Sequence, residues 1–471
     1  MNPLRRAVAC ALIALGMLGA GAAPALAHAT LLSSSPAANT RGVSQTRPTV
    51  VLHFSEPVQI LNRADISVVT NRGLRFDKGA ARTAPGDSRK VIIPLRGPLL
   101  PYSYTVRYRV VSADSHAEAQ AFVFGVGSAK LAAPILAGAG GLTDTSPVAV
   151  AVRVVELVAL GLLLGLIGFR MLVWGPAVAD AAARGLSAGD RDTALRRGQR
   201  LFWRAFWGLA VLAGVAEAGV LAAKSAVVFH TGLITAALEP QSAFNLVAAS
   251  RFGDLLGWRS AALFALIAVA FLTWCAESGR APSVGRRGPF AAMALFSLTA
   301  LTLLSTQGHA SQAPLAPLSI AADAVHLSGA AIWVGGLPCL VAVLLRAPRL
   351  LPDSGRKVAS ATLTRFSKVA LWSVAIIAVT GFARAAGELS TPTELWTTGY
   401  GRDLLLKTQL LLPILLLARK NRRFVAALAH GVTPSAARLR AVARTVQIEL
   451  TIALGIVAIA ALLVAQIPGR A

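Results

Sequence analysis

The chain has 471 residues, of which 55% are hydrophobic and 14% charged, and its mean hydropathy is +0.63. Soluble globular proteins carry about 25% charged residues, so this composition excludes a wholly soluble protein and predicts that most of the chain lies in a membrane. The formal net charge of +25 suggests nucleic-acid binding at first sight, but the placement of the charges, described below, argues against that class.

The first 27 residues have the pattern of a secretory signal peptide. Arg5 and Arg6 precede an apolar stretch over 7–20, and residues 25–27 (Ala-Leu-Ala) form a small-residue cleavage site. Cleavage there would make His28 the first residue of the mature chain. That residue would then offer both an α-amine and an imidazole to a metal ion. The alternative is a histidine that merely follows the cut.

Residues 28–127 alternate between apolar and polar positions as the strands of a small β-domain do. The predicted strands are 49–58, 65–70, 90–95, 102–112 and 121–127. One predicted face of the fourth strand carries Tyr102, Tyr104, Val106, Tyr108 and Val110. About 100 residues in short strands predict a small all-β sandwich of the immunoglobulin-like or cupredoxin-like Greek-key type.

A metal site is predicted between the last two strands, where Asp114 and His116 stand two residues apart. In an extended segment their side chains project to the same side. Together with His28 they would supply an amine nitrogen, two imidazole nitrogens and a carboxylate oxygen, a tetragonal set that favours Cu(II). The alternative is a solvated polar turn. His53, in the middle of a predicted strand, is interpreted as structural.

Three stretches of this domain, "HATLLSSSPAANT", "LHFSEPV" and "YRVVSADSHAEAQAFVFGV", resemble the CopC copper resistance family over nearly all of 28–127. The resemblance implies Cu(II) held by the mature N-terminal histidine and an Asp-x-His pair, which correspond to His28, Asp114 and His116. The chain departs from the family at Ser115, Ala117 and Gln120, where Gly, Pro and Gly are usual. The methionine-rich Cu(I) site of some members has no counterpart, which argues against Cu(I)/Cu(II) exchange in this domain.

A linker rich in Gly and Ala, 128–147, leads to a second domain over 148–468 that contains long apolar runs. Each run is close to the length that a helix needs to cross a bilayer, and an α-helical polytopic membrane domain of about eight helices is predicted. The predicted spans are 148–169, 205–223, 255–275, 290–307, 321–345, 369–387, 403–418 and 446–467.

Lys and Arg are distributed very unevenly among the connecting loops. Alternate loops hold 23 of them, over 170–204, 276–289, 346–368 and 419–445. The other loops hold three, Lys224, Arg251 and Arg402. This asymmetry follows the positive-inside rule. It predicts a multi-pass protein of the bacterial cytoplasmic (inner) membrane with the β-domain and the C-terminus outside, and a lipid bilayer rather than nucleic acid as its partner.

Six ionisable residues are predicted in the outer half of the spans, where burial in a bilayer is costly. They are Arg153, Glu156, Glu217, Asp323, His326 and Arg384. One interpretation is a polar vestibule that opens outward. The other is a set of interhelical ion pairs, for instance Arg153 or Arg384 with Glu156 or Glu217.

A metal path is predicted from His309, at the outer end of the fourth span, together with Asp323 and His326 in the fifth. Asp323 and His326 stand at i and i+3 on one helix face, so they can share an ion or bond to each other. The alternative is interfacial capping and helix packing. His230 and His430 lie in loops and are given no role.

The membrane domain resembles the CopD copper resistance family, strongly over 290–468 and more weakly over 148–289. The stretches that carry the resemblance include "DAVHLSGAAIWVGGL", "RFSKVALWSVAIIAVTGFARA", "YGRDLLLKTQLLLPILLLARKNRR" and "VQIELTIALGIVAIAALLVAQIPG". A CopC-like domain fused to a CopD-like domain implies copper uptake across the cytoplasmic membrane, a direction that comes from the resemblance alone.

The predicted function is therefore copper binding, transport and homeostasis without enzymatic activity. Cu(II) would be captured outside, from a periplasmic copper donor if one exists, and copper would be conducted inward as Cu(II) or Cu(I). No ATP-binding motif is present, so transport would follow or couple to a gradient. The alternatives are a copper sensor or buffer, a copper-dependent oxidase or monooxygenase, and a haem-binding electron-transfer bundle.

Overall fold

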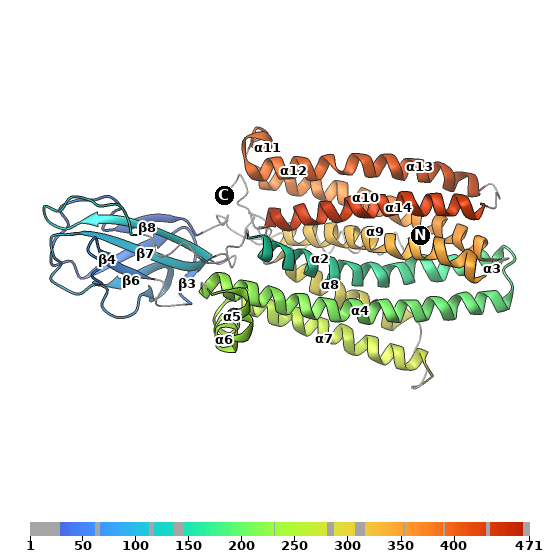
Figure 1. Cartoon of the computed structure of the whole chain (residues 1–471), viewed down its shortest axis with the longest axis horizontal. Helices are drawn as coiled ribbons and strands as arrows, with labels where there is room; N and C mark the ends of the chain where they lie inside the picture. Colours follow the sequence, from blue (N-terminus) through green and yellow to red (C-terminus); the bar gives the residue numbers. More distant parts are fainter. Residues whose placement is uncertain are drawn as a thin grey trace.

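The computed structural model shows a β-domain at one end of a long bundle of helices (Figure 1). It describes residues 29–61, 66–112, 117–135, 146–229, 231–279, 287–306, 316–351, 354–389, 391–429 and 434–464. Several sequence predictions lie outside these residues: the signal peptide 1–27, part of the linker, and His28, Asp114, His116, His230, His309 and His430.

The β-domain consists of two antiparallel sheets packed face to face. In the first, β1 (Leu31–Ser35), β2 (Thr49–Phe54), β6 (Asp87–Pro94) and β5 (Arg82–Ala84) are paired in that order. In the second, β3 (Val58–Gln59) and β4 (Ser67–Thr70) pair with one edge of β7 (Ser103–Ser112), and β8 (Ala117–Gly125) pairs with the other edge.

Alternation of side chains explains the core of this domain. Val50, Leu52 and Phe54 of β2 point inward and meet Tyr104 and Tyr108 of β7, as the period of two predicts. His53, between them, lies on the opposite face of β2. The strands β1 and β5 were not predicted, because β1 is rich in serine and β5 has three residues.

The outer face of β7 is buried at Ser103, Thr105 and Val111, and the chain after β8 explains the first two. The Ala132 N–H donates to Ser103 Oγ at 3.0 Å and the Ile135 N–H donates to Thr105 Oγ1 at 3.1 Å. The start of the predicted linker therefore packs along the sheet instead of extending freely.

The second part of the described chain is helical. Its elements are α2 (Pro147–Gly168), the π-helix η2 (Phe169–Trp174), α3 (Gly175–Ala183), α4 (Ala188–Phe229), α5 (Leu233–Leu238), α6 (Pro240–Ala249), α7 (Arg251–Glu277), α8 (Arg287–Ser305), α9 (Ala316–Leu350), α10 (Gly355–Glu388), α11 (Glu394–Thr397), α12 (Gly399–Gln409), α13 (Leu411–Ala429) and α14 (Ala436–Val464).

Each of the eight predicted spans coincides with helix in this domain, apart from the turn residues Thr306 and Leu410 and from end residues that are not described. Within the described residues, six helices are long and apolar enough to cross a membrane, and Gly288–Leu304 is a shorter apolar helix. The remaining predicted span is divided between α12 and α13. Pro413 explains the division, because a proline lacks the N–H that would bond to Gln409. The count of eight membrane crossings stays a prediction.

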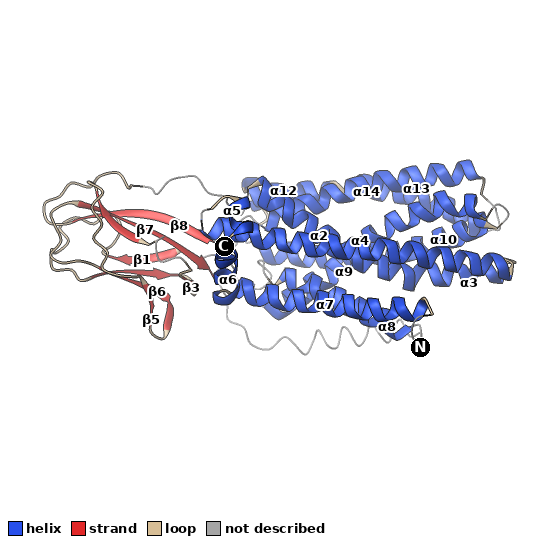
Figure 2. Cartoon of the chain, turned by 60° about the horizontal axis from the view of Figure 1, so that its bottom comes forward, coloured by secondary structure: helices blue, strands red, loops and turns tan. Residues whose placement is uncertain are grey.

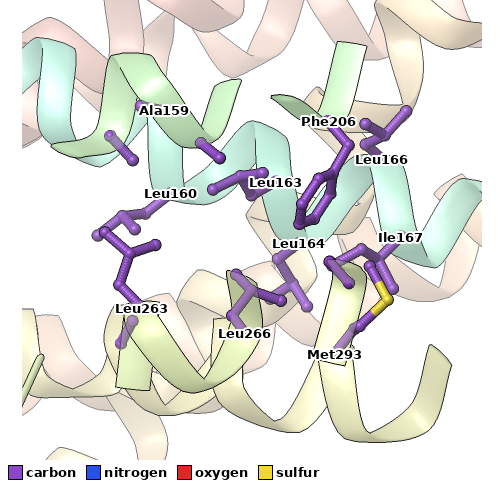
Figure 3. Close-up of a cluster of buried hydrophobic side chains, with 14 of the residues drawn as sticks. Ala159, Leu160, Leu163, Leu164, Leu166, Ile167, Phe206, Leu263, Leu266 and Met293 are labelled. Atoms are coloured by element: carbon purple, nitrogen blue, oxygen red, sulfur yellow. The ribbon is translucent and has the colours of Figure 1, made fainter. Parts of the chain in front are cut away.

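Small residues let α2 and α9 cross closely. A Cβ on Gly165 would lie 2.3 Å from the Ala331 carbonyl oxygen, and a Cβ on Gly335 would lie 2.9 Å from Gly165 Cα. Close backbone approach at small residues is typical of membrane helix pairs. Beside this crossing, leucines of α2 pack with Phe206 of α4, Leu266 of α7 and Met293 of α8 (Figure 3).

The β-domain touches the helical domain through the end of β7. Arg109 Nη1 donates to the Val227 carbonyl in the last turn of α4 at 2.8 Å, which satisfies a carbonyl that the helix itself leaves without a partner. Val111 is buried in a cluster with residues of α4, α6 and α7: Val220, Val228, Leu246, Phe252 and Leu256. Both views place β3 and the short helices α5 and α6 at this junction (Figures 1 and 2).

Candidate metal sites

Three segments of the β-domain meet at the end that faces the helices. The Thr30 N–H donates to Ser55 Oγ at 3.0 Å, and the Ser55 N–H donates to the Thr30 carbonyl at 2.9 Å. Just beyond, Val58 of β3 pairs with Ser112, the last residue of β7. Thr30 and Ser112 stand close in sequence to His28 and to 113–116, and both adjoin the same short segment, Ser55–Val58.

Glu56 lies in the middle of this segment, and sequence reasoning missed it. Its side chain is 3% exposed, and a buried carboxylate must be balanced by hydrogen bonds, a cation or a proton. One signal was available in the sequence, because Glu56 stands at the same parity as Val50, Leu52 and Phe54 of the predicted strand 49–58 and so falls on its apolar face. Because Glu56 belongs to the segment that adjoins Thr30 and Ser112, its carboxylate is a further candidate oxygen ligand beside the three predicted ones.

The second candidate site lies between α9 and α10, and only part of it is described. Asp323 and His326 are both buried, but neither bonds to the other in the described structure. Asp323 Oδ1 pairs with Arg384 Nη1, and His326 Nδ1 lies 3.0 Å from Thr380 Oγ1. The i, i+3 spacing on α9 thus directs both side chains toward α10, which packs along α9.

Thr380 determines which nitrogen of His326 carries the proton. The Thr380 hydroxyl donates to the Ile376 carbonyl at 2.6 Å, so its oxygen accepts a hydrogen bond from His326 Nδ1–H. The Nε2 lone pair is then the one available to a metal ion, since a neutral imidazole has one donor and one acceptor nitrogen.

The surroundings of His326 combine close packing with positive charge. A Cβ on Gly381 would lie 3.3 Å from His326 Cε1, so the glycine leaves room for the ring. Arg384 brings a positive charge to this part of the interface, where it pairs with Asp323 one turn from His326. A metal cation that binds Asp323 would have to displace Arg384 from the carboxylate.

The ion pairs predicted for Arg384 need correction, and those predicted for Arg153 stay a prediction. Arg384 pairs with Asp323 rather than with Glu156 or Glu217, because α10 packs against α9. The two glutamates instead bind Arg259 of α7, a residue the sequence analysis did not single out: Arg259 Nη2 lies 2.8 Å from Glu156 Oε1, and Arg259 Nε lies 3.2 Å from Glu217 Oε1. Arg259 is 1% exposed. This cluster therefore joins α2, α4 and α7 by buried ion pairs and does not form the open vestibule.

No group of three or more His, Cys, Asp or Glu side chains suited to a metal occurs among the residues that the structure describes. Four of the six predicted ligands lie outside that part of the chain. Asp323 and His326 alone do not complete a site, and His309 is the predicted residue that would join them.

The two domains together define a copper-handling membrane protein, and comparison with known families gives the family. Residues 31–127 match the family described as CopC domain, and residues 360–463 match the family described as Copper resistance protein D. The chain belongs to the CopC/CopD copper resistance proteins and carries both domains in one polypeptide.

Relatives of known name resemble either one domain or most of the chain. Copper resistance protein C of Pseudomonas syringae pv. tomato is 33% identical over 117 residues, which are 24% of this chain and 90% of that protein. Copper transport protein CutJ of Bacillus subtilis (strain 168) is 26% identical over 418 residues, 84% of this chain and 69% of that protein.

Among solved structures, CopC from Methylosinus trichosporium OB3b is 27% identical and covers 21% of this chain and 93% of its own, with a TM-score of 0.19. The family and the relatives establish the functional class, copper resistance and transport, and a multi-pass inner-membrane protein fits that class.

Proposed function

We propose that the β-domain captures Cu(II) on the outer side of the cytoplasmic membrane and that the helical domain conducts copper inward. The proposed outer ligands are the amine and imidazole of His28 with Asp114 and His116, and Glu56 as an additional oxygen donor. This nitrogen and oxygen set suits Cu(II), which also heads the affinity order of divalent first-row metals.

One observation carries the proposal. The segment Ser55–Val58 adjoins both Thr30 and Ser112, and the strand that ends at Ser112 is seated on α4, α6 and α7 through Val111. Ligands that flank Thr30 and Ser112 would therefore lie at the junction of the two domains, where copper has a short distance to travel to the helices.

The proposed acceptor in the membrane is His326 through Nε2, with Asp323 and His309. Thr380 already holds Nδ1, so copper binding at Nε2 requires no change of tautomer. Arg384 neutralises Asp323 until a cation takes its place. Copper could pass this site as Cu(II) or, after reduction, as Cu(I).

The outer site is tested on the full mature protein in lipid nanodiscs by Cu(II) affinity and electron paramagnetic resonance. One extra residue before His28 should weaken Cu(II) binding by about tenfold or more and alter the tetragonal signal, because loss of even a supporting ligand contact costs about 10–100-fold. Glu56→Gln should weaken binding in the same direction. His53→Gln is the control, and equal binding by all forms would contradict the N-terminal site.

Transport is tested separately by copper uptake into proteoliposomes. His326→Gln should abolish uptake while the outer Cu(II) signal stays as in the wild type. A wild type that binds Cu(II) but gives no uptake would instead indicate a sensor or buffer, the alternative that binds copper without moving it.

A further inference from the structure

A buried carboxyl group lies between α13 and α14, away from both metal sites. Glu449 of α14 is 4% exposed. Asn421 Nδ2 of α13 donates to Glu449 Oε1 at 2.8 Å, and Thr445 Oγ1 donates to Asn421 Oδ1 at 2.8 Å. The Thr445 hydroxyl also lies 2.8 Å from the Val442 carbonyl of its own helix, so the carbonyl and the amide oxygen share its one proton.

Glu449 differs from the other deeply buried acids of the helical domain in its partner. Glu156 and Glu217 share Arg259, and Asp323 has Arg384, whereas within the described chain no ion pair involves Glu449. Its hydrogen-bond partner there is a neutral amide.

The elements packed against α14 are α2, α9, α12 and α13. The titratable and charged residues are Arg153 and Glu156 on α2; Asp323, His326, Cys339, Arg346 and Arg349 on α9; Tyr400, Arg402, Asp403 and Lys407 on α12; Arg419, Lys420, Arg422 and Arg423 on α13; and Arg444 in the preceding part of α14.

Among the described residues of these elements, no charged group forms an ion pair with Glu449. Arg422 and Arg423, the residues that follow Asn421, are exposed, and Cys339 packs at the edge of the apolar cluster that includes Val446 and Leu450. The charged residues of α2 and α9 near the β-domain already have partners, Arg259 for Glu156 and Arg384 for Asp323. An ionised Glu449 would thus be a buried charge with one neutral donor.

Such a charge is costly in a membrane helix, and a proton removes it. Asn421 donates to Oε1, so the proton is carried by Oε2, and Oε1 remains a good acceptor in the neutral acid. Protonation and release then change the charge between α13 and α14 without breaking the hydrogen bond that joins them.

We propose that Glu449 is a proton-binding site that couples copper movement to a proton gradient. This inference rests on the proposed transport function. Each cycle takes up one proton on Glu449 Oε2 from water on one side of the membrane and releases it to water on the other side as copper moves, so no other reactant is needed. The chain carries no ATP-binding motif, and a gradient is the energy source that remains.

The protonation state is tested first, without copper, by infrared spectroscopy of the full protein in nanodiscs. At neutral pH the wild type should show the C=O band of a neutral carboxylic acid. Glu449→Gln should remove that band and Glu449→Asp should shift it, while Glu239→Gln, a change at an exposed glutamate of the α5–α6 turn, should leave it. A band that is absent from the wild type, or that survives in Glu449→Gln, overturns the proposal.

Coupling is tested by copper uptake into proteoliposomes with and without an imposed pH gradient. Uptake by the wild type and by Glu239→Gln should depend on the gradient, and uptake by Glu449→Gln should not. Gradient dependence in Glu449→Gln, or none in the wild type, overturns the coupling. No copper uptake in the wild type under any condition overturns the transport function and with it the coupling, whereas the infrared band decides separately whether Glu449 binds a proton.

Discussion

Thr380 is the residue through which the protein orients His326. It accepts from Nδ1 and donates to the Ile376 carbonyl. Thr380→Val keeps the shape and removes the acceptor, and loss of such a supporting contact should lower copper uptake by about 10–100-fold. Thr380→Ser should restore uptake.

The matched control for this change is Thr299→Val. Thr299 bonds in the same way to a carbonyl of its own helix, Leu295, at 3.0 Å, but it faces away from the interior. Equal effects of the two valine variants would show that Thr380 serves only its own helix.

Tyr108 gives the β-domain a pH dependence in the alkaline range. Burial, with a contribution from the negative charge of Glu118, raises the pKa of Tyr108 to about 12 from its ordinary value of 10.0. Between these values the unfolded state releases the tyrosyl proton while the folded state keeps it. The free energy of unfolding should therefore fall as pH rises from about 10 to about 12, by about 2 kcal/mol at most.

The measurement is tyrosinate absorbance of the full protein during alkaline titration, combined with thermal unfolding at each pH. Tyr108→Phe should remove the highest-pH component of the absorbance change and flatten the loss of stability. An unchanged titration curve in that variant would contradict the assignment to Tyr108.

At the scale of elements, the crossing of α2 and α9 depends on having no side chain at Gly165. A Cβ there would overlap the Ala331 carbonyl, so Gly165→Ala should force the helices apart and cost about 1–3 kcal/mol. Thermal unfolding of the purified protein should show a lower Tm.

Gly214→Ala in α4 is the control for the crossing. A Cβ at that position meets nothing within 4 Å, and alanine favours a helix over glycine by about 1 kcal/mol. Its Tm should stay the same or rise. A similar fall in both variants would mean that helix propensity, rather than the α2–α9 contact, determines the effect.

For the whole molecule, Val111 holds the β-domain on the helices. Val111→Asp would put a charge into the cluster with Leu246 and Phe252. Burial of the valine contributes about 1.5–3 kcal/mol, and burial of an unpaired carboxylate costs several times as much. Hydrogen exchange in α6 and at the start of α7 should become faster, and copper uptake should fall although Cu(II) binding persists. Leu32→Asp, at an exposed position of the same domain, should change neither.

The architecture could be predicted because it depends on local patterns. Period-two alternation in β7 and long apolar runs in the helical domain reveal a residue's environment from its neighbours in sequence. The short β1 and β5 escaped prediction because they carry little of that pattern. The CopC and CopD resemblances likewise rest on contiguous stretches, 31–127 and 360–463 in the matches.

Composition, periodicity and motifs are properties of the chain alone, so they sufficed for the two-domain plan, the copper-handling class and a list of ionisable residues in the spans. The pairing of those residues became visible in the packed helices: Arg259 with two glutamates, Arg384 with Asp323, and Glu449 with a neutral amide. The same holds for Glu56, because its neighbours in sequence contact the two distant segments: Ser55 bonds to Thr30 and Val58 pairs with Ser112. The reason is that a partner across helices or strands depends on packing and register between distant segments, which no local pattern encodes.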